Sequence, residues 1–163
     1  MKNRKKSFQF KKIPIFIFIF IITTSVITFS EQIFIPVGTN KSVKGGSNFT
    51  GTARIDMLYG ATKERPVSAG YVTFEPGART DWHTHNKGQQ LIVTSGIGFT
   101  QEWGGKLQVI KPGDVIICPP NVKHWHGASP DTAMTHLAIT NYDENGEAVR
   151  WLEKVTNNQY LGK

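Results

Sequence analysis

Cysteine is almost absent from this sequence, since Cys118 is the only one among 163 residues. A single cysteine excludes a disulfide bond within the chain, whatever compartment the protein occupies. Cys118 lies in the apolar stretch "VIICPP", and a free cysteine in such a stretch is most often a small buried hydrophobic side chain. We therefore expect Cys118 to be a core residue and not a nucleophile.

Acidic residues are absent from the first 30 positions, which instead carry six Lys and Arg side chains. Without these six charges, the formal net charge falls from +7 to +1 for residues 31–163. The high isoelectric point therefore belongs to the N-terminus. We expect no nucleic acid partner for the remainder of the chain.

The basic N-terminus is followed by an apolar run from Ile13 to Phe29, a combination typical of an export signal. We expect residues 1–30 to be removed after Ser30, although no Ala-x-Ala cleavage pattern is present. The exported chain would begin at Glu31 and be periplasmic or secreted. The alternative is an uncleaved membrane anchor formed by residues 13–29. In both cases the membrane is a partner only for the N-terminal segment.

Beyond this segment the length suits a single domain. Residues 31–48 mix Gly, Ser, Asn and Lys with a short apolar patch, which favours a flexible arm or linker. Short β-rich runs separated by Gly and Pro then follow over residues 49–163, which predicts an all-β sandwich or barrel. We expect a hairpin around Gly104-Gly105 and a short helical turn capped by Thr156 and Gln159.

Histidine is also scarce, yet four of the five form two His-x-His pairs: His83 with His85, and His124 with His126. Alternate residues of a strand share one face, so the two members of a pair should point the same way. Gln89 follows the first pair and can add an oxygen ligand. If the pairs face each other inside a barrel, three His and one Gln converge. Neutral imidazole suits Mn, Fe, Co, Ni, Cu or Zn. The alternative is that each His satisfies a local hydrogen bond.

Three further residues are candidates for catalysis. His126 shares a strand face with His124, and in "AMTHLAIT" the side chain of His136 shares a face with Met134. We expect His126 and His136 to line a pocket beside the metal, where imidazole can transfer protons or hold a small anion. Thr80 can offer a hydroxyl group to a substrate. The alternatives are a core position for His136 and a rim position for His126.

Two spacings resemble the signature motifs of cupins. The first consists of Gly77, five residues, His83-Thr84-His85, three residues, Gln89, six residues and Gly96. The second consists of Gly113, five residues, Pro119-Pro120-Asn121, two residues and His124. Gln89 stands where the cupin pattern has Glu, and Asn121 stands where it has Gly. Asn tolerates the left-handed backbone conformation that such a Gly would adopt.

Longer stretches such as "VTFEPGARTDWHTH" and "KHWHGASPDTAMTHLAI" resemble the small bacterial cupins that include the manganese-dependent hydroxynitrile lyases. The resemblance covers roughly residues 48–160. It implies a conical antiparallel β-barrel, the double-stranded β-helix or jelly roll, assembled as a homodimer or homotetramer. It also implies that four residues bind a divalent metal, most often manganese: His83, His85, Gln89 and His124.

The resemblance further implies an enzyme that cleaves and forms cyanohydrins from a small-molecule substrate. The metal would act as a Lewis acid on the substrate hydroxyl, and His126 and His136 would move the proton. A neutral Gln89 leaves the metal charge uncompensated, which strengthens the Lewis acid. Two alternatives remain open. The chain is another metal-dependent cupin enzyme, such as a dioxygenase or isomerase, or a non-catalytic cupin that binds a metal or small ligand.

Overall fold

The computed structural model describes residues 31–163, and the predicted export segment, residues 1–30, lies outside them. Residues 34–163 form one compact unit, which contains every described strand and one short helix. No helix among residues 31–163 is long and apolar enough to cross a membrane.

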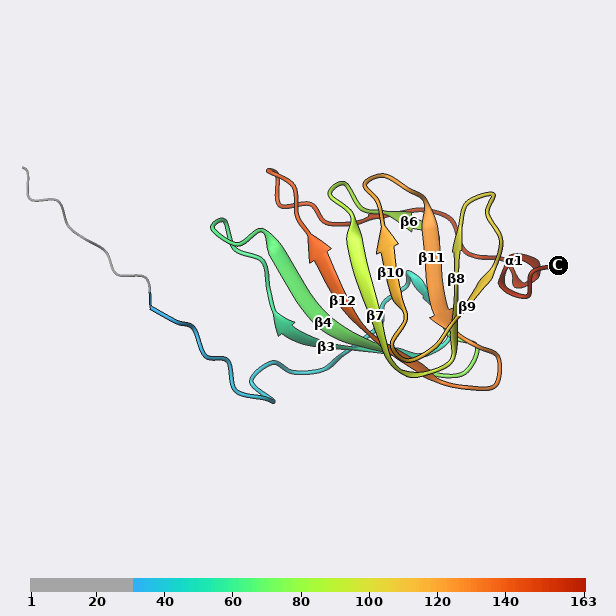
Figure 1. Cartoon of the computed structure of the whole chain (residues 1–163), viewed down its shortest axis with the longest axis horizontal. Helices are drawn as coiled ribbons and strands as arrows, with labels where there is room; N and C mark the ends of the chain where they lie inside the picture. The colour runs from blue at the N-terminus through green and yellow to red at the C-terminus, as the bar shows by residue number, and fades with distance from the viewer. Residues whose placement is uncertain (1–30) are drawn as a thin grey trace, which may run out of the picture. The chain divides into compact units, whose positions relative to one another are not determined.

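One antiparallel sheet has the strand order β1-β3-β4-β12-β7-β10, and its strands curve side by side in Figure 1. Their bounds are β1 Val43–Lys44, β3 Ala53–Tyr59, β4 Val67–Phe74, β12 Met134–Asn141, β7 Gln89–Gly96 and β10 Val115–Cys118. The central strands alternate between buried and more exposed side chains, as strands with one face on a core do. On β12, for example, Met134 and His136 are buried whereas Thr135 and Leu137 are partly exposed.

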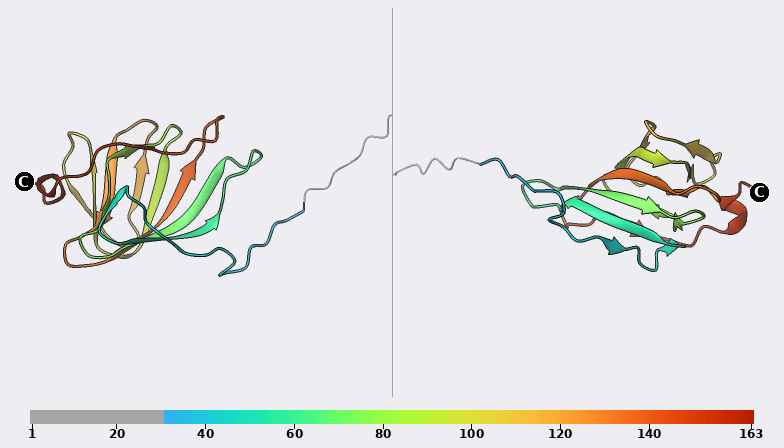
Figure 2. Two further views of the ribbon diagram at one scale, coloured as in Figure 1. Left: turned by 180° about the vertical axis from the view of Figure 1, so that it is seen from behind. Right: turned by 90° about the horizontal axis from the view of Figure 1, so that it is seen from below.

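The second sheet follows the order β13-β6-β11-β5-β2, with β8 paired to both β11 and β9. Its strands are β13 Arg150–Trp151, β6 His83–Thr84, β11 His124–Ala128, β5 Arg79–Thr80, β2 Phe49–Thr50, β8 Gly98–Glu102 and β9 Gln108–Ile110. All seven are only two to five residues long. Figure 2 shows this sheet across from the first, and side chains of both line a common cavity.

Two clusters of buried side chains form the core. The first lies between the sheets and comprises Ala53, Phe74, Ala78, Val93, Ile110, Ala128 and Met134. The second comprises Trp82, Trp125, Val155 and Tyr160, and joins the C-terminal segment to the second sheet. Together with the pairing pattern they confirm the predicted all-β antiparallel barrel.

Several local predictions are also confirmed. Strands β8 and β9 form the hairpin around Gly104-Gly105, and Gly104 has a φ of 77°. Helix α1 (Asn157–Tyr160) begins with the capping box of Thr156 and Gln159. Cys118 is buried, and burial raises the pKa of its thiol to about 12.

The first His-x-His pair does not lie within one strand as we expected, because the chain there is divided into β5 and the short β6. Asp81 and Trp82 separate the two strands. The backbone N–H of Asp81 donates to the carbonyl of Asn48, near the start of the domain, and that of Trp82 donates to the carbonyl of Glu153, near its end. Strand β6 ends at Thr84, so His85 lies just beyond it. Within the expected arm, residues 43–44 form β1, which pairs with β3.

Candidate metal centre

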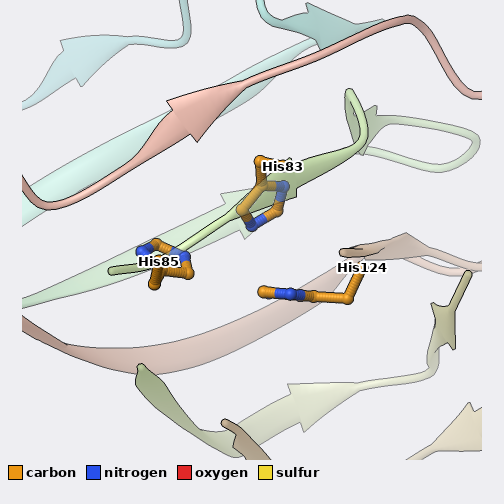
Figure 3. Close-up of side chains that lie close together, drawn as sticks. All are labelled: His83, His85 and His124. Atoms are coloured by element: carbon orange, nitrogen blue, oxygen red, sulfur yellow. The ribbon is translucent and has the colours of Figure 1, made fainter. Parts of the chain in front are cut away.

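Three histidines of the two His-x-His pairs converge at strands β6 and β11 and the residue that follows β6: His83, His85 and His124. One ring nitrogen from each lies within 4.8 Å of the others, and all three side chains are buried (Figure 3). Strands β6 and β11 bring two of them together, since His83 is the direct antiparallel partner of His124. The sequence prediction of a shared metal site thus coincides with a group of side chains that can hold an ion.

Hydrogen bonds fix which nitrogen each ring presents. The Nδ1 atoms of His83, His85 and His124 lie 2.9, 2.7 and 2.9 Å from the carbonyl oxygens of Asp81, Ala148 and Val122, in that order. A carbonyl only accepts, so each Nδ1 carries the proton and each Nε2 keeps its lone pair. The Nε2 atoms of His85 and His124 are buried without a hydrogen bond partner. Such an arrangement is typical of metal-binding imidazoles, and the residues fit a divalent ion.

Gln89, at the start of β7, lines the same cavity as His83 and His85. Its Nε2 donates to Thr140 Oγ1 over 3.0 Å, and this bond sets the orientation of the amide. Its Oε1 is buried and has no partner. An amide oxygen without a partner can bind a cation, so Gln89 stays a candidate for the fourth ligand.

Asn121 joins the two segments that carry the histidines. Its backbone φ is 62°, the one positive value at a non-glycine position among residues 31–163. This is the left-handed conformation that we expected Asn to supply in place of Gly. The backbone N–H of Asn121, which precedes His124 by three residues, donates to the carbonyl of His85 over 2.9 Å.

All five histidines have pKa values below the ordinary 6.5, and burial is the first cause in each. Burial lowers the pKa of His124 and of His136 to about 4. For His83 and His126, burial and neighbouring imidazoles together keep the pKa well below 6.5. Neutral rings at pH 7 are the form that binds metals and accepts protons.

The other predicted site residues face the same cavity. His126 Nδ1 lies 3.1 Å from His136 Nε2, and both rings are buried. The Nε2 of His126 has no partner. Thr80 is buried too, and its Oγ1 accepts the backbone N–H of His126 over 3.2 Å. The structure thus brings all seven predicted residues into one region: six line the cavity, and His124 groups with two of them, His83 and His85.

The cavity measures about 290 Å³ and is mainly apolar. Two of its aromatic side chains were missed by sequence reasoning. Trp151, on β13, lies with its ring centroid 4.9 Å from that of His83 and 5.9 Å from that of Phe49. The pairing of β13 with β6 places Trp151 opposite His83, and this long-range register has no signal in the local sequence.

Comparison with known proteins agrees with this geometry. The family model described as "Cupin domain" matches residues 70–140. A protein named (R)-mandelonitrile lyase from Granulicella tundricola is 55% identical over 125 residues, covering 76% of this chain and 95% of that protein.

Among solved structures, a cupin-like protein from Thermotoga maritima has a TM-score of 0.68 and 42% identity, covering 81% of this chain and 96% of that one. A cupin-2 domain protein from Rhodospirillum rubrum has a TM-score of 0.56 at 17% identity, covering 82% and 85% of the two chains, and shows the fold alone. The fold, the motif spacing and these relatives agree: the chain belongs to the cupin family.

Proposed function

We propose that the chain is a metal-dependent lyase that cleaves and forms cyanohydrins, a hydroxynitrile lyase. One observation carries the proposal: a hydrogen-bonded pair of neutral imidazoles, His126 and His136, lines the same apolar cavity as His83 and His85 of the three-histidine centre. A proton acceptor beside a Lewis acid is what cleavage of an α-hydroxynitrile requires. The 55% identity to a protein named (R)-mandelonitrile lyase supports the same reaction.

The ligands that we propose are His83, His85, His124 and Gln89. A divalent ion held by them would supply a Lewis acid that lowers the pKa of the substrate hydroxyl. We propose manganese as the resident ion because the motifs resemble those of the manganese-dependent lyases. With three imidazoles and one amide oxygen, the ordinary affinity order predicts that Zn, Cu or Ni can displace it in vitro.

The chain's own part in the reaction is to move one proton. We assign the proton between the two rings to Nδ1 of His126, so that its Nε2 keeps a lone pair and can accept the proton of the substrate hydroxyl. The C–C bond then breaks, its electron pair leaves with cyanide, and the oxygen becomes the aldehyde carbonyl. The same Nε2 returns the proton to cyanide, which departs as HCN. His136 stabilises the transient imidazolium through its Nε2.

The shape of the cavity bears on the substrate. Apolar side chains supply most of its surface, and Phe49 and Trp151 form an aromatic wall beside His83. An aromatic aldehyde can pack against this wall while its oxygen faces the metal centre. We propose an aryl cyanohydrin as the substrate class.

The experiment uses protein that begins at Glu31. Bound metal is measured by elemental analysis, and mandelonitrile cleavage is followed with the manganese-loaded protein and the variants His83→Ala and His126→Ala. We expect His83→Ala to lose both metal and turnover, and His126→Ala to keep the metal but lose turnover. Full turnover in His126→Ala would contradict the proton role. Metal binding without cleavage in any form would refute the lyase and favour the oxygenase, isomerase or ligand-binding alternatives.

We also propose that the chain self-associates. Val115 and Ile117 on the edge strand β10 are 60% and 70% exposed, and the outward-facing neighbours on β7 and β12 are uncharged: Gln90, Ile92, Leu137 and Ile139. A second copy can cover this face without charge repulsion. Light scattering should give a mass that is a multiple of the chain mass, and Ile117→Lys should reduce it.

We further propose that the chain is exported and cleaved after Ser30. The N-terminus of the mature protein should then be Glu31.

A further inference from the structure

The three imidazoles of the metal centre are not oriented in the same way. His83 and His124 each bond to a carbonyl two residues earlier in their own segment, so the local backbone fixes both rings. His85 bonds instead to the carbonyl of Ala148, which is 63 residues away. The orientation of His85 therefore depends on a loop that connects β12 to β13.

This loop, residues 143–149, bonds to three consecutive residues that begin with His85. Asn86 Nδ2 donates to Asp143 Oδ2 over 2.8 Å, and Lys87 Nζ lies 2.9 Å from Glu144 Oε1. The 2.7 Å bond of His85 to Ala148 completes the series. Figure 1 shows the segment after β12 passing beside β6 on its way to α1.

Asp143 has a central place in these contacts. Its Oδ1 accepts the backbone N–H groups of Asn145 and Glu147 over 3.0 and 2.8 Å, while Oδ2 accepts from Asn86. These bonds lower the pKa of Asp143, so the carboxylate is charged at neutral pH. One side chain thus folds the turn and fastens it to the segment of His85. Ala148 follows directly after the residue that the carboxylate holds.

We propose that Asp143 is a positioning residue for the metal centre: through the turn 143–147 it places the Ala148 carbonyl that holds His85 with Nε2 toward the metal. Metal affinity then depends on a carboxylate that touches neither metal nor substrate. Ala148 and Val149 also line the cavity, so the loop that orients His85 forms part of the cavity wall. The inference rests on the proposed metal site but not on the lyase reaction.

The test compares four variants of the full domain: Asp143→Ala, Asn86→Ala, Glu144→Ala and Asp114→Ala. Asn86→Ala removes the link from Asp143 to the segment of His85 and leaves the internal bonds of the turn. Glu144→Ala removes an exposed ion pair of the same loop. Asp114→Ala is the matched control, because its carboxylate accepts the N–H of Lys111 in an exposed turn outside the cavity.

The first measurement is the dissociation constant for Mn and Zn, by competition with a chelator. We expect Asp143→Ala and Asn86→Ala to displace the Ala148 carbonyl and thereby weaken binding about 10- to 100-fold, the usual effect of losing the outer hydrogen bond partner of a metal ligand. Glu144→Ala and Asp114→Ala should stay within about two-fold, since exposed pairs contribute little. Unchanged affinity in both Asp143→Ala and Asn86→Ala would overturn the proposal. Equal loss in Asp114→Ala would do the same, because it would indicate general destabilisation.

The second measurement is the tautomer of His85 in metal-free protein, from nitrogen chemical shifts. We expect Nδ1–H to predominate in the unmodified chain and to lose that preference in Asp143→Ala, with His83 and His124 unchanged. A fixed His85 tautomer in the variant would contradict the assigned role. Neither readout requires cyanohydrin turnover, so failure of the lyase proposal and failure of this one can be told apart.

Discussion

Replacement of His136 by Ala separates proton transfer from metal binding. The His136 side chain is fully buried, and its Nε2 lies 3.1 Å from Nδ1 of His126. Its removal leaves the Nδ1 of His126 unpaired, which costs about 1–3 kcal/mol. The emptied volume beside Phe74 opens toward the cavity, so water can enter it, and we expect a total loss of about 2–4 kcal/mol in the free energy of unfolding.

The effect on turnover should be larger than the effect on stability. Without His136, the imidazolium formed at His126 loses its partner, and the ring is free to adopt the other tautomer. We expect kcat for mandelonitrile cleavage to fall by about 10²- to 10⁴-fold, the usual contribution of acid–base catalysis. The metal content should not change, because His136 is outside the group that can hold the ion.

The assay combines urea unfolding, elemental analysis and steady-state kinetics on the same preparations. Thr135→Val is the control: it removes a side-chain hydrogen bond of 3.0 Å to Thr73 from the neighbouring position of β12, on the outer face. It should lose at most about 1 kcal/mol and keep full turnover. Loss of metal from His136→Ala, or turnover equal to that of the unmodified enzyme, would refute the reasoning.

Four further results are expected. The unfolding free energy of metal-free protein should decrease as the pH is lowered from 6.5 to about 4, by up to about 1.4 kcal/mol per pH unit for a histidine such as His136. The reason is that the unfolded ring takes up a proton in this range and the folded ring does not. Superimposable unfolding curves across this range would contradict the prediction. Cys118 should resist alkylation at pH 8 until the protein is unfolded, which mass spectrometry can follow. Asn121→Gly should be tolerated, whereas Asn121→Val should destabilise by about 1–3 kcal/mol in thermal unfolding because of its positive φ. Gln89→Glu should slow metal loss to a chelator and reduce turnover, with Gln108→Glu at an exposed position of β9 as the control.

Much of the fold could be predicted because its determinants are local. The Gly104 turn and the capping box of Thr156 each depend on a few adjacent residues, and both occur as expected. The expectation that His83 and His85 lie on one strand was wrong for the opposite reason, because β6 ends at Thr84. Its end depends on where the amides of Asp81 and Trp82 find acceptors, and those acceptors are far away in the sequence.

The same distinction applies to the site. The grouping of the imidazoles could be predicted, since each pair carries its spacing in the sequence. The support of His85 could not, because the partner is a backbone carbonyl, and a carbonyl leaves no trace in residue identity. The aromatic wall was missed because Trp151 faces His83 only through pairing of two short, distant strands.

The charges around the cavity connect the sequence to the proposed chemistry. The cavity lining within residues 31–163 includes no Asp, Glu, Lys or Arg, and its histidines are neutral at pH 7. Where the cupin pattern has Glu, Gln89 adds no negative charge. A divalent ion held here would therefore keep its full charge in an apolar environment, where Coulomb attraction is poorly screened. The compensating anion must come from the ligand, and both species formed during cyanohydrin cleavage, the alkoxide and cyanide, supply one.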